Sequence, residues 1–409
     1  MNDTLPWLAI VGIGEDGVEG LSGAARAAVK GAAAVFGGTR HLTLAASLIH
    51  GEAIAWPARM KTAIPTILAR RGEKIAVLVS GDPFWHGLGS LLADLVPIAE
   101  MTVFPRPAAF SLACARLGWP LQRITTISLC GHPLPTLIPH LQPRARVLAL
   151  SADATTPAQV AALLVARGFG PSRMHILEAL GGPRERVRET AADAFALDDV
   201  GPLNLLGLDL EAGPEAAIIP RAPGLPDDFF AHDGQISKRE IRALALSALA
   251  PRRGERLWDI GAGAGSIAIE WLLADPTNAA IAIEADPARA ARIRDNAATL
   301  GVPRLEVVIG EAPASLSGLA APDAVFIGGG ARTEGLIEAA WAALAPGGRL
   351  VAHAVTLETE MVLAAARARL GGRMTRIGIA RLAPLGALSG FRPAMVVTAW
   401  QVEKPWISA

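Results

Sequence analysis

The stretch that most constrains the fold of this chain is LWDIGAGAGSIAIEW, residues 257–271. It reads as an apolar strand, a turn in which glycine and alanine alternate, and the start of a helix. Apolar runs of the same kind recur elsewhere, as in KIAVLVSGDP from Lys74 and RVLALSAD from Arg146, and each leads into loop-forming residues. Alternating strands and helices predict an α/β protein whose sheets are parallel and whose ligands bind at the carboxyl ends of strands.

The chain length and one proline-rich segment predict two domains. A chain of 409 residues exceeds one ordinary hydrophobic core. From Glu211 the sequence reads EAGPEAAIIPRAPGLPDDFFAHDGQ, and its prolines are tolerated neither inside a helix nor in a central strand. We therefore expect a first domain over residues 1–215, a linker over 216–221 and a second domain over 222–409.

Composition excludes several classes of protein. Lys plus Arg and Asp plus Glu both total 38, so no bulk field draws the chain to nucleic acid or to an anionic membrane. The longest uncharged run, residues 124–143, contains four prolines and is unsuited to a membrane helix. The N-terminus carries no signal-peptide pattern, which predicts a cytoplasmic protein. Cys114 and Cys130 supply neither a disulfide framework nor a metal-ligand cluster, so we expect no metal site.

The glycine turn indicates which nucleotide it holds. A dinucleotide fingerprint reads G-x-G-x-x-G, whereas here Ser266 stands in the place of the third glycine. Asp259, two residues before Gly261, would repel a pyrophosphate and attract an ammonium group. Glu284 ends the next strand, where a carboxylate can accept hydrogen bonds from ribose hydroxyls. This pattern favours S-adenosylmethionine (SAM), which has an ammonium group and no phosphate; the alternative is a turn whose glycines serve only packing.

Three residues near this turn are candidates for the chemistry. Lys238 and Arg239 precede a helix whose N-terminus suits a polar ligand, although an ordinary solvated cap would also explain them. His353 lies at a strand end in LVAHAV and could face the pocket or be a buried core histidine. We treat Lys238, Arg239 and His353 as the catalytic candidates.

The N-terminal half contains a second glycine loop, GIGEDG from Gly12, which alone is weak evidence for a ligand. Together with SGDPFWHG, ARLGWP, EALGGPRERV and LNLLGLDL, it resembles the tetrapyrrole methylases. The segments GLPDDFFAHDGQISKREIRAL, LWDIGAGAGSIAIEW, PDAVFIGGG and RPAMVVTAW resemble the decarboxylating precorrin methyltransferases. The resemblance extends from about Leu8 to Trp400 and rests on several independent motifs in a fixed order.

The resemblance implies the fold and the function. It implies a tetrapyrrole methylase fold of two α/β subdomains, followed by a Rossmann-like class I SAM methyltransferase domain. It implies a bifunctional enzyme of cobalamin biosynthesis that methylates an anionic tetrapyrrole, precorrin-6B, at ring position 5 in the first domain and at position 15 in the second. The ring C acetate is decarboxylated, the product is precorrin-8X, and each domain binds one SAM. We expect a homo-oligomer, with neither nucleic acid nor membrane as a partner.

A different function stays open on the residues alone. The chain could be a SAM methyltransferase for another small molecule, with a non-catalytic SAM-binding or scaffold domain at the N-terminus. That alternative predicts methyl transfer without release of carbon dioxide.

The resemblance also carries over cofactor contacts. In the first domain they fall on two strand-end loops and two later positions: Gly12, Gly14, Gly81, Asp82, Pro83, Ala109 and Cys130. In the second domain the resemblance adds contacts to Asp259, which was derived above from the glycine turn. These contacts are Ser237, Gly261, Ala262, Gly263, Ala264, Gly265, Glu284 and Ala312. The chain departs from the family pattern in PRPAAFS, which has alanines where relatives often have serine, in Cys130 and His132, where relatives often have His and Arg, and at His353, where asparagine is common.

The implied chemistry needs cations rather than a nucleophile or a metal. Methyl transfer from a sulfonium to a ring carbon is an in-line displacement in which the enzyme mainly aligns the two centres and excludes water. The acetate and propionate groups of the substrate should meet arginine or lysine. The residues whose position suits this role are Arg106, Arg184, Arg186, Lys238 and Arg332.

Overall fold

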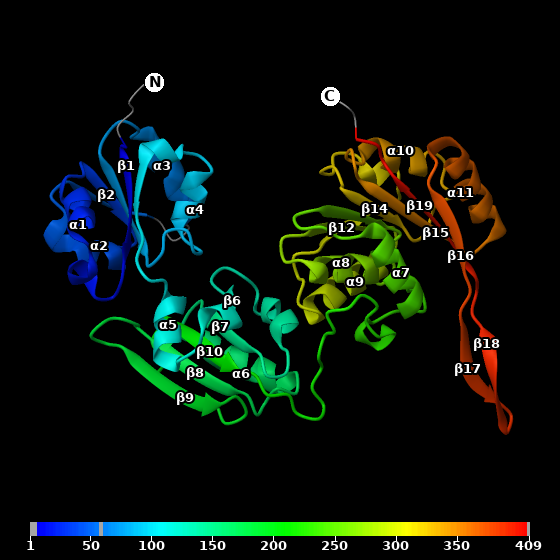
Figure 1. Ribbon diagram of the computed structural model, residues 1–409, viewed down its shortest axis with the longest axis horizontal. Coiled ribbons are helices and arrows are strands. Elements are labelled where there is room, and N and C mark those ends of the chain that lie inside the picture. The colour runs from blue at the N-terminus through cyan, green and yellow to red at the C-terminus, as the bar shows by residue number, and fades with distance from the viewer. Residues whose placement is uncertain (1–5, 57–59, 407–409) are drawn as a thin grey trace. The chain divides into compact units, whose positions relative to one another are not determined.

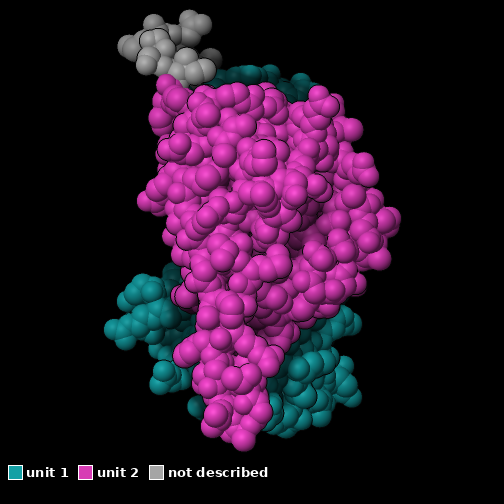
Figure 2. Space-filling view, turned by 90° about the vertical axis from the view of Figure 1, so that its right-hand side faces the viewer, with its two compact units in different colours: residues 1–134, 140–217 teal, residues 135–139, 218–409 magenta. Residues whose placement is uncertain are grey.

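The computed structural model describes residues 6–56 and 60–406, and the chain divides into two compact units. Unit 1 runs to Leu134 and includes His140–Ala217; unit 2 comprises Pro135–Pro139 and the chain from Ile218 onward (Figure 2). The ends of the two predicted domains, residues 1–5 and 407–409, lie outside the described residues. In the described part of the chain, no helix is long and apolar enough to cross a bilayer.

Unit 1 begins with a five-stranded parallel sheet, sheet A, in the order β3-β2-β4-β1-β5. Its strands are β1 Leu8–Ile13, β2 Ala34–Gly37, β3 Glu52–Ala55, β4 Ile75–Ser80 and β5 Met101–Phe104. The helices α1 Gly23–Lys30, α2 Thr39–Ala45, α3 Ile64–Ala69 and α4 Leu88–Ala93 cover both faces (Figure 1). Two buried apolar clusters, one on each face, explain why β1 and β4 are apolar at almost every position.

The second sheet of unit 1, sheet B, has the order β6-β7-β10-β8-β9. Its strands are β6 Thr125–Ser128, β7 Arg146–Leu150, β8 Arg173–Glu178, β9 Arg186–Ala191 and β10 Asn204–Asp209, with the helices α5 Ala109–Leu117 and α6 Thr156–Ala166. Only β6 and β7 pair in parallel, so the prediction of parallel sheets is wrong here. The link from Glu178 to Arg186 is too short for the crossover that a parallel pair requires.

Unit 2 is built on a seven-stranded sheet, sheet C, in the order β13-β12-β11-β14-β15-β19-β16. Its strands are β11 Arg256–Ile260, β12 Ala279–Glu284, β13 Glu306–Ile309, β14 Ala324–Ile327, β15 Arg349–Ala354, β16 Arg373–Ile377 and β19 Val397–Glu403. Its helices are α7 Arg239–Leu249, α8 Ser266–Ala274, α9 Pro287–Thr299, α10 Leu336–Ala343 and α11 Leu357–Leu370. The strands β11 to β15 are parallel, and the strand order reverses between β11 and β14.

The segment RPAMVVTAW predicts a last strand that is antiparallel and lies at the edge of the sheet. This strand, β19, is antiparallel to β15. The prediction that it forms the sheet edge is wrong, because β16 pairs with its other side. Its Trp400 is fully buried, as an interior strand requires.

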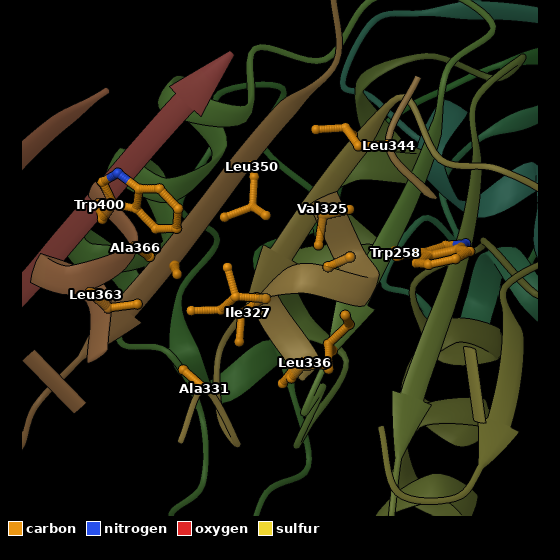
Figure 3. Packing of buried hydrophobic residues seen from close by; sticks show 14 of the residues in the cluster. Trp258, Val325, Ile327, Ala331, Leu336, Leu344, Leu350, Leu363, Ala366 and Trp400 are labelled. Carbon is orange, nitrogen blue, oxygen red and sulfur yellow. The ribbon is translucent and has the colours of Figure 1, made fainter. Parts of the chain in front are cut away.

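The core of unit 2 lies between sheet C and two of its helices (Figure 3). Val325, Ile327 and Leu350 point from β14 and β15 toward Leu336 of α10 and Leu363 of α11. This packing fixes the strands whose carboxyl ends form the site described below.

A two-stranded hairpin, β17 Ala380–Leu385 and β18 Leu388–Pro393, extends from unit 2 as a separate arm (Figure 1). It carries four exposed apolar side chains: Leu382, Leu385, Leu388 and Phe391. This arm was not predicted from the sequence.

Candidate active sites

Unit 1 contains a cavity of about 360 Å³ at the carboxyl ends of the strands of sheet A, closed on the other side by residues of sheet B. Four of the predicted SAM contacts line it: Gly14, Gly81, Ala109 and Cys130. The Cys130 thiol donates a hydrogen bond to the Ser151 carbonyl at 3.0 Å, and burial raises the pKa of the thiol. Cys130 is therefore a protonated wall residue rather than a nucleophile.

The other three predicted contacts shape the loops and do not line this cavity. A Cβ on Gly12 would lie 1.9 Å from the Gly81 carbonyl oxygen, so Gly12 permits the close approach of two strand ends. The Asp82 carboxylate accepts a hydrogen bond from the Phe84 N–H at 2.8 Å and fixes the turn after β4. The Pro83 carbonyl occupies the space that a side chain at position 87 or 89 would need.

The arginines predicted for substrate carboxylates in unit 1 do not line the cavity either. Arg106 lies 2.5 Å from the Asp16 carboxylate. Arg186 is paired with both Glu178 and Asp199. Arg184 is the most exposed of the three, with its guanidinium 3.9 Å from Glu15.

Several lining residues of unit 1 were not singled out in the sequence. They include Arg40, His41, Trp56, Ser80 and Trp85. Trp85 lies within SGDPFWHG, whereas the pair Arg40 and His41 follows β2 with no motif to mark it. β2 and β4 are parallel neighbours in sheet A, so the loops that follow these two strands lie at one edge of the sheet.

Unit 2 contains a larger cavity, of about 900 Å³, at the carboxyl ends of β11, β12, β14 and β15. This is the point where the strand order reverses, the usual ligand position in an open α/β sheet. The predicted residues that line it are Ser237, Lys238, Asp259, Gly261, Ala262, Gly263, Glu284, Ala312 and His353. Ala264, Gly265, Arg239 and Arg332 are not among the lining residues.

The glycine turn between β11 and α8 requires glycine at all three alternate positions. Gly261, Gly263 and Gly265 have φ angles of +69°, +59° and +75°, a region that side chains other than glycine rarely adopt. A Cβ on Gly263 would lie 2.8 Å from the Gln235 carbonyl oxygen, and one on Gly265 would lie 2.7 Å from Ile293. Gly265 thus serves the packing of α8 on α9, while Gly261 and Gly263 present backbone to the cavity.

Glu284 holds this turn from the neighbouring strand. Its Oε2 accepts a hydrogen bond from the Gly263 N–H at 2.8 Å, and its Oε1 accepts one from the Asp286 N–H at 3.1 Å. The side chain is 6 % exposed and faces the cavity. Each carboxylate oxygen has a further acceptor site, so ribose hydroxyls can be bound without breaking either bond.

Asp259 is the most unusual group of the cavity. It is 1 % exposed, and its Oδ2 accepts a hydrogen bond from the Ala268 N–H at 3.1 Å. Its Oδ1 has no hydrogen-bond partner among residues 6–56 and 60–406. Burial, together with the nearby Glu284, raises the pKa of Asp259 to about 7. A buried carboxylate with one unsatisfied oxygen suits a cationic ligand group.

The three catalytic candidates occupy different environments. His353 is 9 % exposed, packs edge-on against Phe326 at 5.1 Å between ring centroids, and has its pKa lowered to about 4 by burial. Lys238 lines the cavity with its Nζ 3.8 Å from Asp227. Arg239 does not line the cavity and donates a hydrogen bond to the Gly224 carbonyl. Because its pKa is lowered to about 4, His353 is neutral at physiological pH.

A buried ion pair that was not predicted from the sequence holds the segment around Ser237. Arg242 is fully buried, with its Nε 2.5 Å from Glu270 and its Nη1 3.1 Å from Asp227. It also donates to the carbonyl oxygens of Ser237 and Leu225. Two helices, α7 and α8, thereby fix one wall of the cavity.

Family models match most of the chain. Residues 8–196 match the family "Tetrapyrrole (Corrin/Porphyrin) Methylases", and residues 228–404 match the "Precorrin methyltransferase domain". Membership of these methyltransferase families implies that the chain uses SAM. The cavity of unit 2 fits that molecule, since Asp259 offers an unsatisfied buried oxygen and Glu284 offers acceptors beside the turn.

Individual relatives match over nearly the full length. A "Precorrin-6Y C(5,15)-methyltransferase [decarboxylating]" of Sinorhizobium sp is 54 % identical over 98 % of this chain and 97 % of its own. One of Mycobacterium tuberculosis is 42 % identical over 97 % of this chain and 100 % of its own. The crystal structure of the C-terminal domain of precorrin-6Y C5,15-methyltransferase from Rhodobacter capsulatus is 48 % identical and covers 46 % of this chain and 100 % of its own, with a TM-score of 0.44. This chain therefore belongs to the precorrin-6Y C(5,15)-methyltransferase (decarboxylating) family.

Proposed function

We propose that this chain is a bifunctional methyltransferase of cobalamin biosynthesis. It methylates precorrin-6B at ring positions 5 and 15 and removes the carboxyl group of the ring C acetate, giving precorrin-8X. The observation that carries this proposal is the presence of a separate cavity in each unit, each lined by residues of its own family motif.

The two reactions are assigned to the two units by their motifs. We infer that unit 1, which matches the tetrapyrrole methylases, methylates position 5. Unit 2, which matches the precorrin methyltransferase domain, methylates position 15 and decarboxylates the substrate. Each unit binds one SAM, so a chain holds two.

In unit 2 the proposed SAM site has three parts. The turn at Gly261 and Gly263 lets backbone approach the ligand without side chains in between. Asp259 would bind the ammonium group of SAM through its unsatisfied Oδ1, and Glu284 would accept hydrogen bonds from the ribose hydroxyls. Ser237 and Ala312, from neighbouring loops, close the site.

In unit 1 the proposed SAM site uses the cavity residues Gly14, Gly81, Ala109 and Cys130. Gly12, Asp82 and Pro83 act on it through the loop geometry described above. Glu15 is the one carboxylate among the described residues that line this cavity, and no aspartate corresponds to Asp259 there. In this proposal the two units bind SAM through different kinds of residues.

The chain's own residues contribute alignment and exclusion of water. When bound, SAM supplies a methyl group on a positively charged sulfur, and the electron-rich ring supplies the nucleophile. The apolar walls, such as Ile267 and Phe326 in unit 2, keep water from the methyl group. Lys238 is positioned to meet a substrate carboxylate, and neutral His353 can offer a hydrogen bond to the ring.

We also propose a homo-oligomer and a cytoplasmic location. The four exposed apolar side chains of the β17–β18 arm, at the lower end of unit 2 in Figure 2, support association between copies of the chain. Two free cysteines suit a reducing compartment. Sedimentation of the purified chain tests the first proposal, and a monomer at micromolar concentration would contradict it.

The proposed function is tested by incubating the full chain with SAM and precorrin-6B and analysing the product by mass spectrometry. We expect a product with two added methyl groups and one carboxyl group fewer, and two S-adenosylhomocysteines formed per product. A product that gains methyl groups but keeps every carboxyl group would contradict the decarboxylation.

A further inference from the structure

The cavity of unit 1 contains a polar cluster that the proposed function has not used: Arg40, His41, Ser80 and Glu15. Arg40 and His41 lie at the start of α2, directly after β2, while Ser80 ends β4. Because β2 and β4 are parallel neighbours, their carboxyl ends bring together residues forty positions apart. All four residues line the cavity.

The hydrogen bonds of this cluster fix the role of His41. The Arg40 Nη2 donates to the His41 Nε2 at 2.8 Å and to the Ser80 Oγ at 2.9 Å, and the Ser80 Oγ lies 2.9 Å from the same Nε2. A guanidinium can only donate, so Nε2 must carry its lone pair and the neutral ring must carry its proton on Nδ1. Burial and the Arg40 charge lower the pKa of His41 to about 4. His41 is therefore a fixed acceptor and not a base at physiological pH.

Arg40 retains the capacity to bind a ligand. It also donates from Nη1 to Glu15, so three of the five N–H donors of a guanidinium are engaged. The other two have no partner in the described part of the chain. Glu15 lies between Arg40 and Arg184, so this group of three carries a net positive charge. Among the described lining residues of this cavity, Arg40 is the one Arg or Lys.

We propose that Arg40, held in place by Glu15, His41 and Ser80, binds a carboxylate of the ligand in the cavity of unit 1. This inference rests on the proposed function, in which both candidate ligands carry carboxylates. One source is an acetate or propionate group of the tetrapyrrole, and the other is the α-carboxylate of SAM. His41 is a positioning residue, because it acts on the ligand only through Arg40.

The first arm of the test measures methyl transfer to precorrin-6B by the full chain carrying Arg40→Met. If the carboxylate belongs to the tetrapyrrole, we expect KM to rise about tenfold or more with kcat changed less than about threefold. Arg40→Lys, which keeps the charge, should recover part of this loss. Arg26→Met is the matched control, since Arg26 lies outside the cavity and pairs with Glu19 at 3.6 Å.

The second arm titrates the same variants with S-adenosylhomocysteine by calorimetry. If the carboxylate belongs to SAM, one of the two binding events should weaken about tenfold or more in Arg40→Met. Substrate KM and S-adenosylhomocysteine affinity that both match those of Arg26→Met would overturn the proposal. A wild-type chain that transfers no methyl group to precorrin-6B would instead remove the proposed function, and this inference with it.

The positioning role of His41 is tested by a pair of variants. His41→Leu removes the acceptor, whereas His41→Gln keeps an acceptor oxygen within reach of Arg40. We expect the affected constant, substrate KM or S-adenosylhomocysteine affinity, to worsen in His41→Leu and to stay within about threefold of wild type in His41→Gln. Equal effects of the two variants would contradict the positioning role.

Discussion

At the scale of single residues, the proposed cofactor site of unit 2 depends most on Asp259. Its carboxyl is buried, keeps one oxygen unsatisfied in the described structure and has a pKa raised to about 7. An ammonium group beside it would favour the charged form and lower that pKa again. Binding and protonation at this residue are therefore linked.

The linkage predicts a pH dependence of cofactor affinity. Below pH 7 Asp259 is increasingly protonated in the free protein, so a cation is bound less well. We expect S-adenosylhomocysteine to bind to unit 2 about tenfold more weakly at pH 6 than at pH 8. Calorimetry on the full chain carrying Ala109→Phe, which fills the cavity of unit 1, isolates this event. The Asp259→Asn variant should bind S-adenosylhomocysteine weakly at both pH 6 and pH 8. An affinity of the Asp259 protein that does not change with pH would refute the role of Asp259.

The same residue predicts an effect on stability. The pKa of about 7 in the folded protein lies above the ordinary value of 3.8 for an aspartate, so the ionised form is penalised only in the folded state. This penalty develops as the pH rises from about 4 to above 7. Asp259→Asn should therefore raise the free energy of unfolding of the ligand-free protein at pH 8 by up to about 4 kcal/mol, and its Tm should rise accordingly. The gain in stability should be smaller at pH 5. An equal or lower Tm at pH 8 would show that burial does not strain this carboxyl.

Residue chemistry was predictable where it depended on local sequence. The spacing of Gly261 and Gly263 and the charge of Asp259 are written in one short stretch, and the structure places all three in one cavity. Arg40 was not predictable, because its partners Glu15 and Ser80 lie 25 and 40 positions away. Arg106 was proposed for substrate binding because its partner Asp16, 90 positions away, could not be seen.

At the scale of elements, the buried Arg242 joins α7 to α8 and holds the carbonyl oxygen of Ser237 at the cavity. Nothing in KREIRAL distinguishes this arginine from its exposed neighbours. The same limit applies to sheet B and to β16, since strand pairing depends on connection length and on distant partners. By contrast α8, β12 and β15 follow the apolar pattern closely.

Removing Arg242 should be costly because it leaves Glu270 buried without its cation. We expect Arg242→Met to destabilise unit 2 by about 3–5 kcal/mol, measured by urea unfolding of the full chain. The double variant Arg242→Met, Glu270→Met should be more stable than the single variant, because no unpaired buried charge remains. Arg252→Met serves as the control and should change stability by less than about 1 kcal/mol, because the Arg252 side chain is exposed and Glu255 keeps its ion pair with Arg349. A single variant as stable as this control would contradict the structural role.

At the scale of the whole molecule, the chain joins two units whose cavities are built differently. The cavity of unit 2 is lined by a glycine turn that precedes a helix and by carboxylates, whereas the cavity of unit 1 is lined by strand-end loops from two sheets. Two unlike sites in one chain make sense if each performs its own methyl transfer on one substrate. We propose this division of work between the two units.

The most direct test compares two full-length variants, each with one cavity filled. Ala109→Phe fills the cavity of unit 1, and Ala262→Phe fills that of unit 2. With SAM and precorrin-6B, we expect Ala109→Phe to give a product with one added methyl group and one carboxyl group fewer. We expect Ala262→Phe to give a product with one added methyl group and every carboxyl group, and a mixture of the two variants to give the doubly methylated, decarboxylated product. A variant that still adds both methyl groups, in a protein whose Tm is unchanged, would contradict the claim that each unit performs one transfer.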